Sequence, residues 1–457
     1  MIEVISPVIA RYTATLTYAD LPGDVRCTAK RCLLDWMGAV FAARNEAVAL
    51  RLRELAASLG GHPDATIIAF GDRTSWLNAC LVNGSMAHLA ESDDIFREGI
   101  YHPGAPTIAA ALAVAEKIHS SGRELIVAIV GGYEVSTRIA QAINPSHYRF
   151  WHTTGTVGTL GAAIAAAILL RLNETQTIHA LGLAATQAAG LAQTIIEQTD
   201  GKPLHSGKAA LNGALAAFLA ASGFNGPQEP LMGLRGFCRV VSNSIDEDAL
   251  TRGLGDEHNI LKVTFKFYPS CGHTHSAIDA ALYLAREEHL GPEDIAEVDL
   301  STYSAAVDVA GNDDPKTPYE AKFSLRYCVA VALAFGEVTS RLFEPSVLQS
   351  PDIRHVMERI RVRRDPALDE EFPAKRTSII RIVTKDGREL TRREDYRKGD
   401  PEKPLSEDDV KVKFMDLGRN AGISCGRLTA IAERIMNIED VEDVSFLCQA
   451  VSESINS

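Results

Sequence analysis

Apolar residues recur at the three- and four-residue spacing of helices from near residue 25 to near residue 222, and Gly, Pro, Asn or Asp separates the repeats. Several of these segments are apolar on nearly every side, which is typical of helices that pack inside other helices. The first half of the chain is therefore predicted to form a helical domain. The pattern predicts helices over residues 25–43, 47–59, 75–89, 107–120, 124–143, 156–170, 174–189 and 208–222.

Small residues fill the helix predicted over 156–170. Gly155, Gly158 and Gly161 stand among alanines, and side chains this small let neighbouring helix backbones approach closely. A phosphate-binding loop is the alternative interpretation. The glycine spacing matches no dinucleotide-binding fingerprint, however, and Gly207-Lys208 is followed by alanine instead of Ser or Thr. We therefore interpret these glycines as packing positions.

After Phe265 the pattern changes to the two-residue period of strands. Asp386-Gly387 is a hairpin signal between the last two of these strands. This part is therefore predicted to be a small α+β unit. Its strands are expected over 296–301, 359–363, 377–384 and 389–393, and its helices over 276–288 and 321–335.

The end of the chain is predicted to be helical again. Residues 398–404 form a charged linker that contains proline, and Ser406 with Asp409 has the pattern of a capped helix start. We expect this tail to pack on the first domain. The predicted fold is therefore mainly α with an α+β part, in which residues 1–265 together with 405–457 form one domain and 266–404 the other.

Composition and charge exclude several classes of partner. A chain of 457 residues is too long for one core, which agrees with two domains, one inserted into the other. A formal net charge of −13 argues against nucleic acid as a partner. With 46% hydrophobic and 23% charged residues the composition is that of an ordinary globular protein. An anionic substrate would need a local cationic pocket.

The cysteines and the N-terminus point to the cytoplasm. The eight cysteines are scattered without a CxxC pair, so neither a disulfide framework nor a zinc site is expected. Met1-Ile2-Glu3-Val4 lacks the basic region of a signal peptide, and no apolar run reaches the length of a membrane span. We expect a cytoplasmic protein without a membrane partner.

Acidic and imidazole side chains crowd together between residues 88 and 102. Glu91, Asp93 and Asp94 lie between His88 and His102, and a Pro/Gly break follows. Neighbouring carboxylates raise one another's pKa, and histidine titrates near neutrality, so the segment has the residues needed for acid–base chemistry. A solvated acidic helix end with an incidental histidine is the alternative.

Four further segments carry candidate functional groups. His152 precedes a predicted helix, whose free N–H groups favour an anion, although a buried core histidine is the alternative. Lys202 is expected just ahead of a helix, where a surface lysine is the ordinary interpretation. Residues 321–328 form an amphipathic segment that helix packing alone explains. The fourth segment, residues 266–275, contains Lys, Tyr, Cys and His at the domain boundary, where small-molecule sites concentrate.

A metal site is not expected at residues 266–275. On a strand, His273 and His275 would share a face, but no third ligand is evident nearby in the sequence. The sequence also contains no serine nucleophile elbow, kinase signature or HExxH motif. What remains is a set of cationic and acid–base residues without a cofactor motif.

Taken in order, these segments resemble the MmgE/PrpD family across nearly the whole chain. The motifs are specific for the fold and much less specific for the reaction. The residues that carry the resemblance are Asn83-Gly84 to His88 with Asp93-Asp94, His102-Pro103-Gly104-Ala105-Pro106, His152 with Gly155 to Gly158, Lys202-Pro203-Leu204-His205, Phe265 to Cys271, Thr274 to Asp279 and Ala321 to Tyr327.

The family includes 2-methylcitrate dehydratase, cis-aconitate decarboxylase and iminodisuccinate epimerase, which act on small polycarboxylates without metal or organic cofactor. The resemblance implies a large all-helical domain made by both chain ends, a smaller α+β lid domain, a cleft between them and a homodimer. It implies catalytic roles for His102, His152, Lys202, Lys266 and Asp93. We expect Glu91, Asp94, Tyr148, Cys271 and His273 to bind the substrate.

Three departures from the family pattern bear on the reaction. Glu91 and Ile95 stand where lyases of the family commonly have Asp and Thr, and Cys271 stands where a decarboxylase would have His. The shared chemistry is removal of a proton next to a carboxylate, with Lys202 and Lys266 holding carboxylates and His102 or His152 taking the proton. These departures favour an epimerase of an iminodisuccinate-like substrate. A 2-methylcitrate dehydratase-like lyase is the alternative, a decarboxylase is third, and a non-catalytic binding protein is the alternative of another class.

Overall fold

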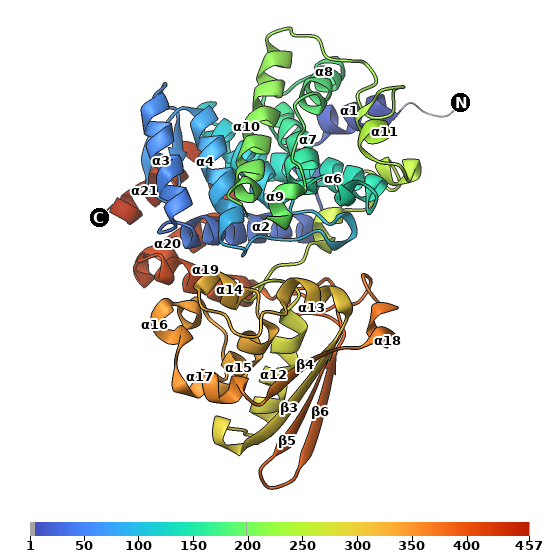
Figure 1. Ribbon diagram of the computed structural model, residues 1–457. Helices are drawn as coiled ribbons and strands as arrows, with labels where there is room; N and C mark the ends of the chain where they lie inside the picture. The colour runs from blue at the N-terminus through green and yellow to red at the C-terminus, as the bar shows by residue number, and fades with distance from the viewer. Residues whose placement is uncertain (1–4, 198, 457) are drawn as a thin grey trace. The chain divides into compact units, whose positions relative to one another are not determined.

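The structure is a computed structural model that describes residues 5–197 and 199–456 (Figure 1). The expectation about a signal peptide concerns residues 1–4, which lie outside the described residues. The chain divides into two compact units. Met1–Thr264 together with Val410–Ser457 forms the helical unit, and Phe265–Asp409 forms the α+β unit. The two chain ends therefore contribute to one unit.

The eight helices predicted for the first half of the chain are confirmed, and the largest shift of an end is seven residues, at the start of α10. The principal helices are α1 (Ile5–Thr15), α2 (Gly23–Ala42), α3 (Ala47–Leu59), α4 (Trp76–Leu89), α5 (Gly104–Lys117), α6 (Gly122–Ile143), α7 (Thr153–Leu169), α8 (Glu174–Ala185), α10 (Gly201–Ala221), α19 (Glu407–Asn420), α20 (Cys425–Met436) and α21 (Val444–Asn456), with the short helices α9 (Gln193–Ile196) and α11 (Phe237–Val241) (Figure 1).

Helix α7 lies in the centre of the helical unit, in contact with α5, α6 and α10 (Figure 1). A Cβ atom on Gly158 would lie 2.6 Å from Cγ of Pro106, and one on Gly161 would lie 2.9 Å from Cβ of Ser136. Contacts this short confirm that these glycines are packing positions. Although α7 is buried along nearly its whole length, no helix in the described part of the chain is long and apolar enough to cross a membrane.

Helix α10 begins at Gly201 and not at residue 208, so the prediction that Lys202 precedes the helix is wrong. Pro203 caused the error, since proline usually ends a helix. In the first turn of a helix, however, the missing N–H of proline costs nothing, because that group has no intrahelical acceptor. Lys202 and His205 therefore lie three positions apart on one helix, on neighbouring turns of the same face.

The C-terminal tail packs on the N-terminal helices. The ring of Phe414 on α19 lies 5.9 Å from the ring of Phe41 on α2. Lys413 donates to the Asp35 carboxylate at 2.6 Å and to the Ser92 carbonyl at 2.6 Å, with both ionised side chains buried. Because a buried charge is tolerated only when it is paired, this lysine fixes the loop that follows α4.

A two-stranded hairpin of β1 (Ala65–Ile67) and β2 (Asp72–Thr74) also belongs to the helical unit. The sequence analysis did not predict it, because three residues are too few to establish a two-residue period. Asn83 on α4 accepts from the Ile68 N–H at 3.0 Å and donates to the Thr66 carbonyl at 2.8 Å. This asparagine of the family motif thus fastens α4 to the hairpin.

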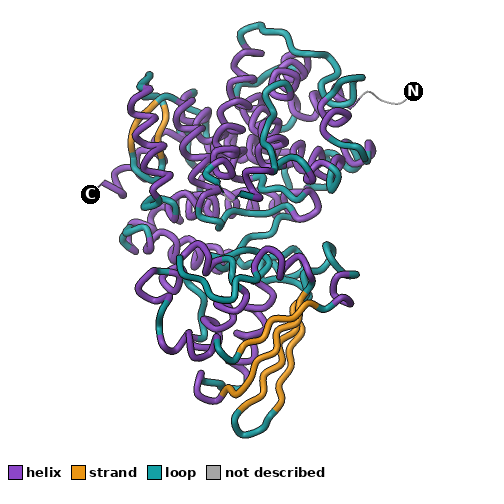
Figure 2. The backbone as a smooth tube through the Cα atoms, in the orientation of Figure 1, coloured by secondary structure: helices purple, strands orange, loops and turns teal. Residues whose placement is uncertain are grey.

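The α+β unit contains a four-stranded sheet in the order β4-β3-β5-β6 (Figure 2). The predicted strands are confirmed as β3 (Ile295–Thr302), β4 (Ile360–Arg364), β5 (Ser378–Thr384) and β6 (Glu389–Glu394). Strand β3 pairs parallel with β4 and antiparallel with β5, and β5 and β6 form the predicted hairpin. Helix α12 (His275–Glu287) packs on β5 and β6, because alternate residues of β5 are buried.

The helix predicted over 321–335 is two helices, α14 (Pro318–Lys322) and α15 (Leu325–Phe335). The hydroxyl of Ser324 accepts from the Tyr327 N–H at 3.1 Å and so caps α15, which ends the apolar repeat at that point. The other helices of the unit are α13 (Ser304–Ala310), α16 (Pro345–Leu348), α17 (Pro351–Met357) and α18 (Pro366–Asp369).

Candidate active site

Four histidines of the helical unit form a cluster. His88 lies in the last turn of α4, His102 precedes α5, His152 is the residue before α7, and His205 lies near the start of α10. Ring centroids are 4.7 Å apart for His88 and His102, 5.3 Å for His88 and His152, and 5.4 Å for His152 and His205. We call these four residues the histidine cluster.

Asp93 joins two members of the histidine cluster. Its Oδ2 lies 2.6 Å from Nδ1 of His88 and 3.1 Å from Nδ1 of His102, and the aspartate is only 1% exposed. Nδ1–H of His88 donates a hydrogen bond to this carboxylate, whereas Nδ1 of His102 faces it at ion-pair distance without a hydrogen bond. The negative charge beside Nδ1 favours the tautomer of neutral His102 that carries its proton there, which leaves Nε2 as the basic nitrogen. It also stabilises the imidazolium that forms when that nitrogen takes a proton.

The same three residues are the candidate metal ligands found in the described ranges. Their ligand atoms lie within 4.8 Å of one another. Ligands that share one zinc ion at about 2.0–2.2 Å in tetrahedral geometry lie more than about 3 Å apart. The 2.6 Å separation of His88 and Asp93 is therefore that of a charge-assisted hydrogen bond.

Asp94 has different partners from Asp93. It accepts from the Tyr133 hydroxyl at 2.8 Å and from the Gly104 N–H at 3.0 Å, at the first turn of α5. Burial, with a smaller contribution from the carboxylate of Asp35, raises the pKa of Asp94 to about 7. Asp94 thus holds the start of α5, immediately after His102. Its predicted role in substrate binding stays a prediction.

Glu91 contacts Lys202. The Glu91 carboxylate accepts a hydrogen bond from Nζ of Lys202, and both side chains are mostly buried. Glu91 has a φ of 57°, in the left-handed region that non-glycine residues rarely adopt. Such a conformation costs on the order of 1–3 kcal/mol and persists where the surroundings fix it. The backbone strain at Glu91 therefore lowers the stability of the loop after α4, while it directs this carboxylate toward Lys202.

His152 lies at the entrance of a helix, as predicted, because it is the residue before α7. It is 3% exposed, and its backbone N–H donates to the Gly190 carbonyl at 2.8 Å. Burial first, and then the positive charges that His88 and Lys202 can present, lower the pKa of His152 well below its usual range. His152 is therefore neutral near pH 7. To stay neutral when one ring nitrogen loses a proton, it must gain a proton at the other.

In the α+β unit, the candidate residues lie on the segment before α12. Lys266 is 2% exposed, and Cys271 is buried with its N–H donating to the Lys322 carbonyl at 2.9 Å. His273 and His275 do not lie on a strand, because the segment turns and His275 begins α12. Nδ1 of His273 lies 2.6 Å from the Tyr303 hydroxyl, whereas Nε2 of His275 lies 3.2 Å from the Ser270 carbonyl. The two rings thus serve separate partners.

Comparison with known proteins decides the family. The chain matches the MmgE/PrpD N-terminal domain over residues 8–248 and the MmgE/PrpD C-terminal domain over residues 268–435. The chain belongs to the MmgE/PrpD family. It is 29% identical to cis-aconitate decarboxylase of Homo sapiens over 471 residues, covering 98% of this chain and 94% of that protein. It is 31% identical to 2-methylcitrate dehydratase of Cupriavidus necator over 134 residues, which is 28% of this chain and 27% of that protein.

A second dehydratase, the 2-methylcitrate dehydratase of Escherichia coli (strain K12), is 28% identical over 145 residues, covering 30% of this chain and 29% of that protein. The relatives named here are thus a decarboxylase and two dehydratases. At the level of the family, this MmgE/PrpD protein is an enzyme that processes carboxylates.

The structure brings some, but not all, of the predicted site residues of this MmgE/PrpD enzyme together. Asp93, His102 and His152 meet in the histidine cluster, and Lys202 contacts Glu91 beside it. Tyr148 lies on the short 3-10 helix His147–Arg149 and is 37% exposed. Its role in substrate binding stays a prediction.

Sequence reasoning did not assign roles to His88 and His205. A signal for each was nevertheless present. His88 precedes Asp93 by only five residues. His205 follows Lys202 by three residues, a spacing that puts the side chains of Lys202 and His205 on one face of a helix. Pro203 hid the second signal, because it moved the predicted helix start past His205.

Proposed function

We propose that this MmgE/PrpD enzyme is a cofactor-independent lyase acting on a small hydroxy-di- or tricarboxylate. It removes a proton next to a carboxylate and expels the hydroxyl group of the neighbouring carbon as water. The observation that carries the proposal is that His102, held by Asp93, and the neutral His152 lie in one cluster. Elimination of water needs a base and an acid that reach neighbouring carbons.

His102 is the better base of the two. The Asp93 carboxylate stabilises the imidazolium of His102, whereas burial and nearby cations oppose a positive charge on His152. The carbon–hydrogen bond breaks as its proton moves to Nε2 of His102, and its electrons form the new carbon–carbon double bond. The carbon–oxygen bond breaks as His152 gives its Nε2 proton to the departing hydroxyl. Water and an unsaturated polycarboxylate result.

Lys202 supplies positive charge for the negative charge that develops on the substrate carboxylate. In the substrate-free protein its ammonium contacts Glu91. A substrate carboxylate therefore binds by sharing this lysine with Glu91 or by displacing that carboxylate. Fixed charges of this kind stabilise an enolate-like intermediate more than the ground state, because the charge on the oxygens grows in the transition state.

An epimerase is the second candidate. Glu91 favours it, because this residue replaces the aspartate of the lyase pattern and its longer side chain reaches Lys202. The relatives named dehydratase and decarboxylase support the lyase instead, so we place the lyase first. Cys271, in place of the histidine expected in a decarboxylase, places decarboxylation third.

Proton NMR in heavy water tests the proposal on three substrate classes: hydroxy-tricarboxylates, an unsaturated tricarboxylate and an imino-dicarboxylate. We expect a new vinyl signal from a hydroxy-tricarboxylate, absent with the His102→Asn variant. Exchange of the α-proton into recovered substrate without a vinyl signal would replace the lyase with the epimerase. Release of carbon dioxide from the unsaturated acid would replace it with the decarboxylase. Unchanged spectra for all three classes would remove the proposed function.

A further inference from the structure

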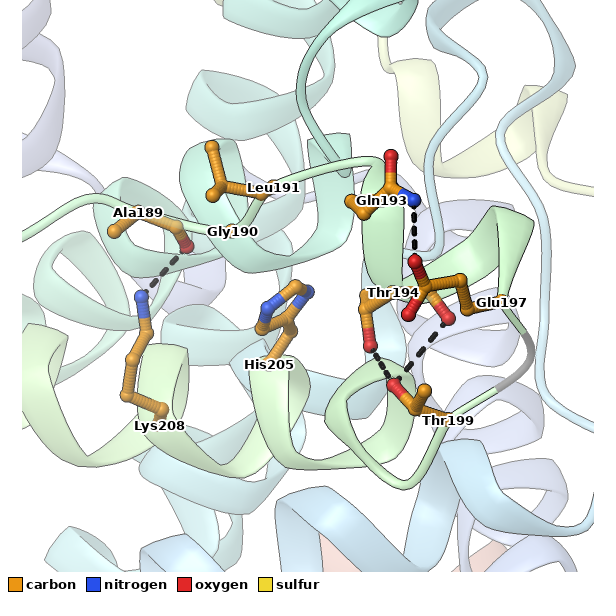
Figure 3. Close-up of a pocket in the computed structure, with 9 residues that line it drawn as sticks. All are labelled: Ala189, Gly190, Leu191, Gln193, Thr194, Glu197, Thr199, His205 and Lys208. Atoms are coloured by element: carbon orange, nitrogen blue, oxygen red, sulfur yellow. Dashed lines mark hydrogen bonds between the residues drawn. The ribbon is translucent and has the colours of Figure 1, made fainter.

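We propose that His205 is a relay residue that passes protons between Nδ1 of His152 and the solvent of the pocket in Figure 3. The proposal rests on the acid–base function proposed above and adds the route that keeps the buried acid neutral while it gives up its proton. His205 does not touch the substrate in this scheme. It acts through His152.

The contact between the two imidazoles admits one proton. Nδ1 of His152 lies 3.2 Å from Nδ1 of His205, so one nitrogen donates and the other accepts. If His205 donates, a neutral His152 must carry its proton on Nε2 and is ready to act as an acid. If His152 donates, its Nε2 is bare and acts as a base. The position of this single proton therefore sets the role of His152.

The pocket connects His205 to solvent. It has a volume of about 480 Å³, and the ring of His205 stands among its lining residues (Figure 3). His152, in contrast, is 3% exposed. The lining residues are Ala189, Gly190, Leu191, Gln193, Thr194, Glu197, Thr199, His205 and Lys208.

Two glycines make room for the ring of His205. A Cβ atom on Gly190 would lie 3.1 Å from Nδ1 of His205, and one on Gly155 would lie 2.9 Å from its Cβ. The Gly190 carbonyl also accepts a hydrogen bond from the backbone N–H of His152. The same short segment thus fixes one histidine through its backbone and leaves space for the other. The imidazole pair is therefore seated by the fold.

The surrounding charges make a neutral relay useful. His88, His102, Lys202 and His205 all act on His152, and with burial they oppose its imidazolium form. A simple acid would have to carry that unfavourable charge before each turnover. A relay avoids the charge, because His152 gains a proton at Nδ1 as it loses one at Nε2.

Charges on the pocket side act on His205 itself. Nζ of Lys208 donates to the Ala189 carbonyl at 2.6 Å, and the Glu197 carboxylate accepts from Gln193 at 2.6 Å (Figure 3). Burial first, and then the charge of Lys208 and of His88, lower the pKa of His205 to about 4. His205 is therefore also neutral near pH 7, and it must take a proton from solvent as it gives one up.

Each proton transfer in the relay breaks one bond to hydrogen and forms another. The N–H bond at Nδ1 of His205 breaks, and its proton forms the N–H bond at Nδ1 of His152. The Nε2–H bond of His152 breaks, and that proton forms the O–H bond of the departing water. His205 takes a proton at Nε2 from hydronium or from a buffer acid in the pocket. After the product leaves, the reverse shift resets the pair. Water carries the substrate proton from His102 to Nε2 of His152, the Nδ1 proton of His152 returns to Nδ1 of His205, and the Nε2 proton of His205 returns to solvent, so no net proton is gained or lost.

The test compares His205→Asn and His205→Ala with the wild-type enzyme. Asparagine can keep a hydrogen bond to Nδ1 of His152 but cannot take up one proton while releasing another. We expect both variants to lower kcat on the order of 10–100-fold with little change in KM, since proton transfer by a positioned group contributes about 10²–10⁴-fold. We also expect added imidazole to restore kcat of His205→Ala by entering the vacated pocket. His179→Ala is the control, because His179 hydrogen-bonds Gly226 instead, and imidazole should leave its rate unchanged.

Three outcomes separate the relay from the proposed function. If His205→Asn keeps the wild-type kcat, the relay is wrong and the lyase function stands. If His205→Ala is slow but imidazole does not restore it, His205 has a structural role and the relay is wrong. If the wild-type enzyme itself transforms none of the three substrate classes, the proposed function fails. For that case, ¹⁵N-histidine NMR still tests the contact, because loss of the Nδ1 partner in His205→Ala should shift the tautomer balance of His152.

Discussion

The carboxylate of Glu91 and the ammonium of Lys202, from the loop after α4 and from the first turn of α10, form an ion pair beside the histidine cluster. Lys202 is thereby neutralised before any substrate binds. Because the chain carries a net charge of −13, an incoming polycarboxylate meets an overall repulsive protein and needs this cation locally. We therefore expect this ion pair to affect the binding of the proposed polycarboxylate substrate.

Loss of the lysine should raise KM, and loss of the glutamate charge should lower it. Lys202→Ala should raise KM for a polycarboxylate on the order of 10–100-fold, since a hydrogen bond to a charged group contributes about 1.5–3 kcal/mol. Glu91→Gln should lower KM, because the lysine no longer has an anionic competitor. Lys117→Ala is the control and should leave KM unchanged, because this lysine at the end of α5 pairs with Asp64 instead. A lower KM for Lys202→Ala would contradict the assignment.

Lys266 supplies the matching test in the α+β unit. It is 2% exposed, and the family resemblance assigns it a catalytic role. We expect Lys266→Ala to raise KM and lower kcat, and Lys266→Arg to recover binding only in part, because a guanidinium differs in shape from an ammonium. Steady-state kinetics on purified, folded variants measures both effects. Wild-type kinetics for Lys266→Ala would remove this residue from the site.

His102→Gln should abolish exchange of the substrate α-proton with solvent, whereas Cys271→Ser should retain part of it. His102 is the proposed base because the Asp93 carboxylate lies 3.1 Å from its Nδ1 and stabilises its charged form. Cys271 is buried, with its backbone N–H bonded to the Lys322 carbonyl, and we expect it to take no part in removing the proton. Mass spectrometry of substrate recovered from heavy water measures the exchange. Full exchange by His102→Gln would assign the base to another residue.

Much of the fold could be predicted from the sequence, because long periodic segments and strong turn signals dominate it. The strands of the α+β unit were predicted to within one residue, since each alternates cleanly and Asp386-Gly387 fixes the hairpin. The errors arose where a local signal conflicted with packing. Pro203 hid the first turn of α10, and Ser324 divided a helix that its apolar residues joined.

The candidate site was predictable in its residues but not in its contacts. Nothing in the sequence indicates that Asp93 contacts two histidines while Asp94 hydrogen-bonds Tyr133 and Gly104. Adjacent residues in a loop point in different directions, and only the packed structure decides which partner each one meets. His205 was missed for the same reason, because its partner His152 lies 53 positions away.

The Asp94→Asn variant should remove part of the pH dependence of stability. The pKa of Asp94 is about 7 in the folded protein and about 3.9 in an unfolded chain. The folded state thus binds this proton more tightly, so the contribution to stability is full below about pH 4 and is lost as pH rises towards about 7. His147 and His205, whose pKa burial lowers to about 4, act in the opposite direction.

The measurement therefore compares the melting temperature of Asp94→Asn with that of wild type at each pH. We expect the variant to gain stability relative to wild type as the pH rises from about 4 to about 7. Asparagine can still accept from Gly104 and can donate to the Tyr133 oxygen, which keeps the local contacts. Parallel pH profiles for the two proteins would show that Asp94 does not titrate in this range.

Treatment with EDTA should leave activity intact. The 2.6 Å contact between His88 and Asp93 is a hydrogen-bond distance, so the proposed chemistry uses these groups as a proton network. Activity before and after dialysis against EDTA, with metal analysis of the dialysed protein, measures this. Activity that falls and returns with a divalent cation would mean that His88, Asp93 and His102 close on an ion instead.

Gly104→Ala should damage the site while Gly23→Ala should not. Both glycines are the first residue of a helix, α5 and α2, and nothing lies within 4 Å of a Cβ built on Gly23. A Cβ on Gly104 would lie 2.5 Å from the Tyr133 hydroxyl and 2.7 Å from Oδ1 of Asp94. The start of α5 would have to move, and His102 precedes it by two residues. We expect a loss of about 1–3 kcal/mol in stability, as in other overpacked sites, and a larger fall in kcat than in stability-matched variants elsewhere. Denaturant unfolding and steady-state kinetics measure the two effects, and equal behaviour of the two glycine variants would show that the contact with Asp94 does not position His102.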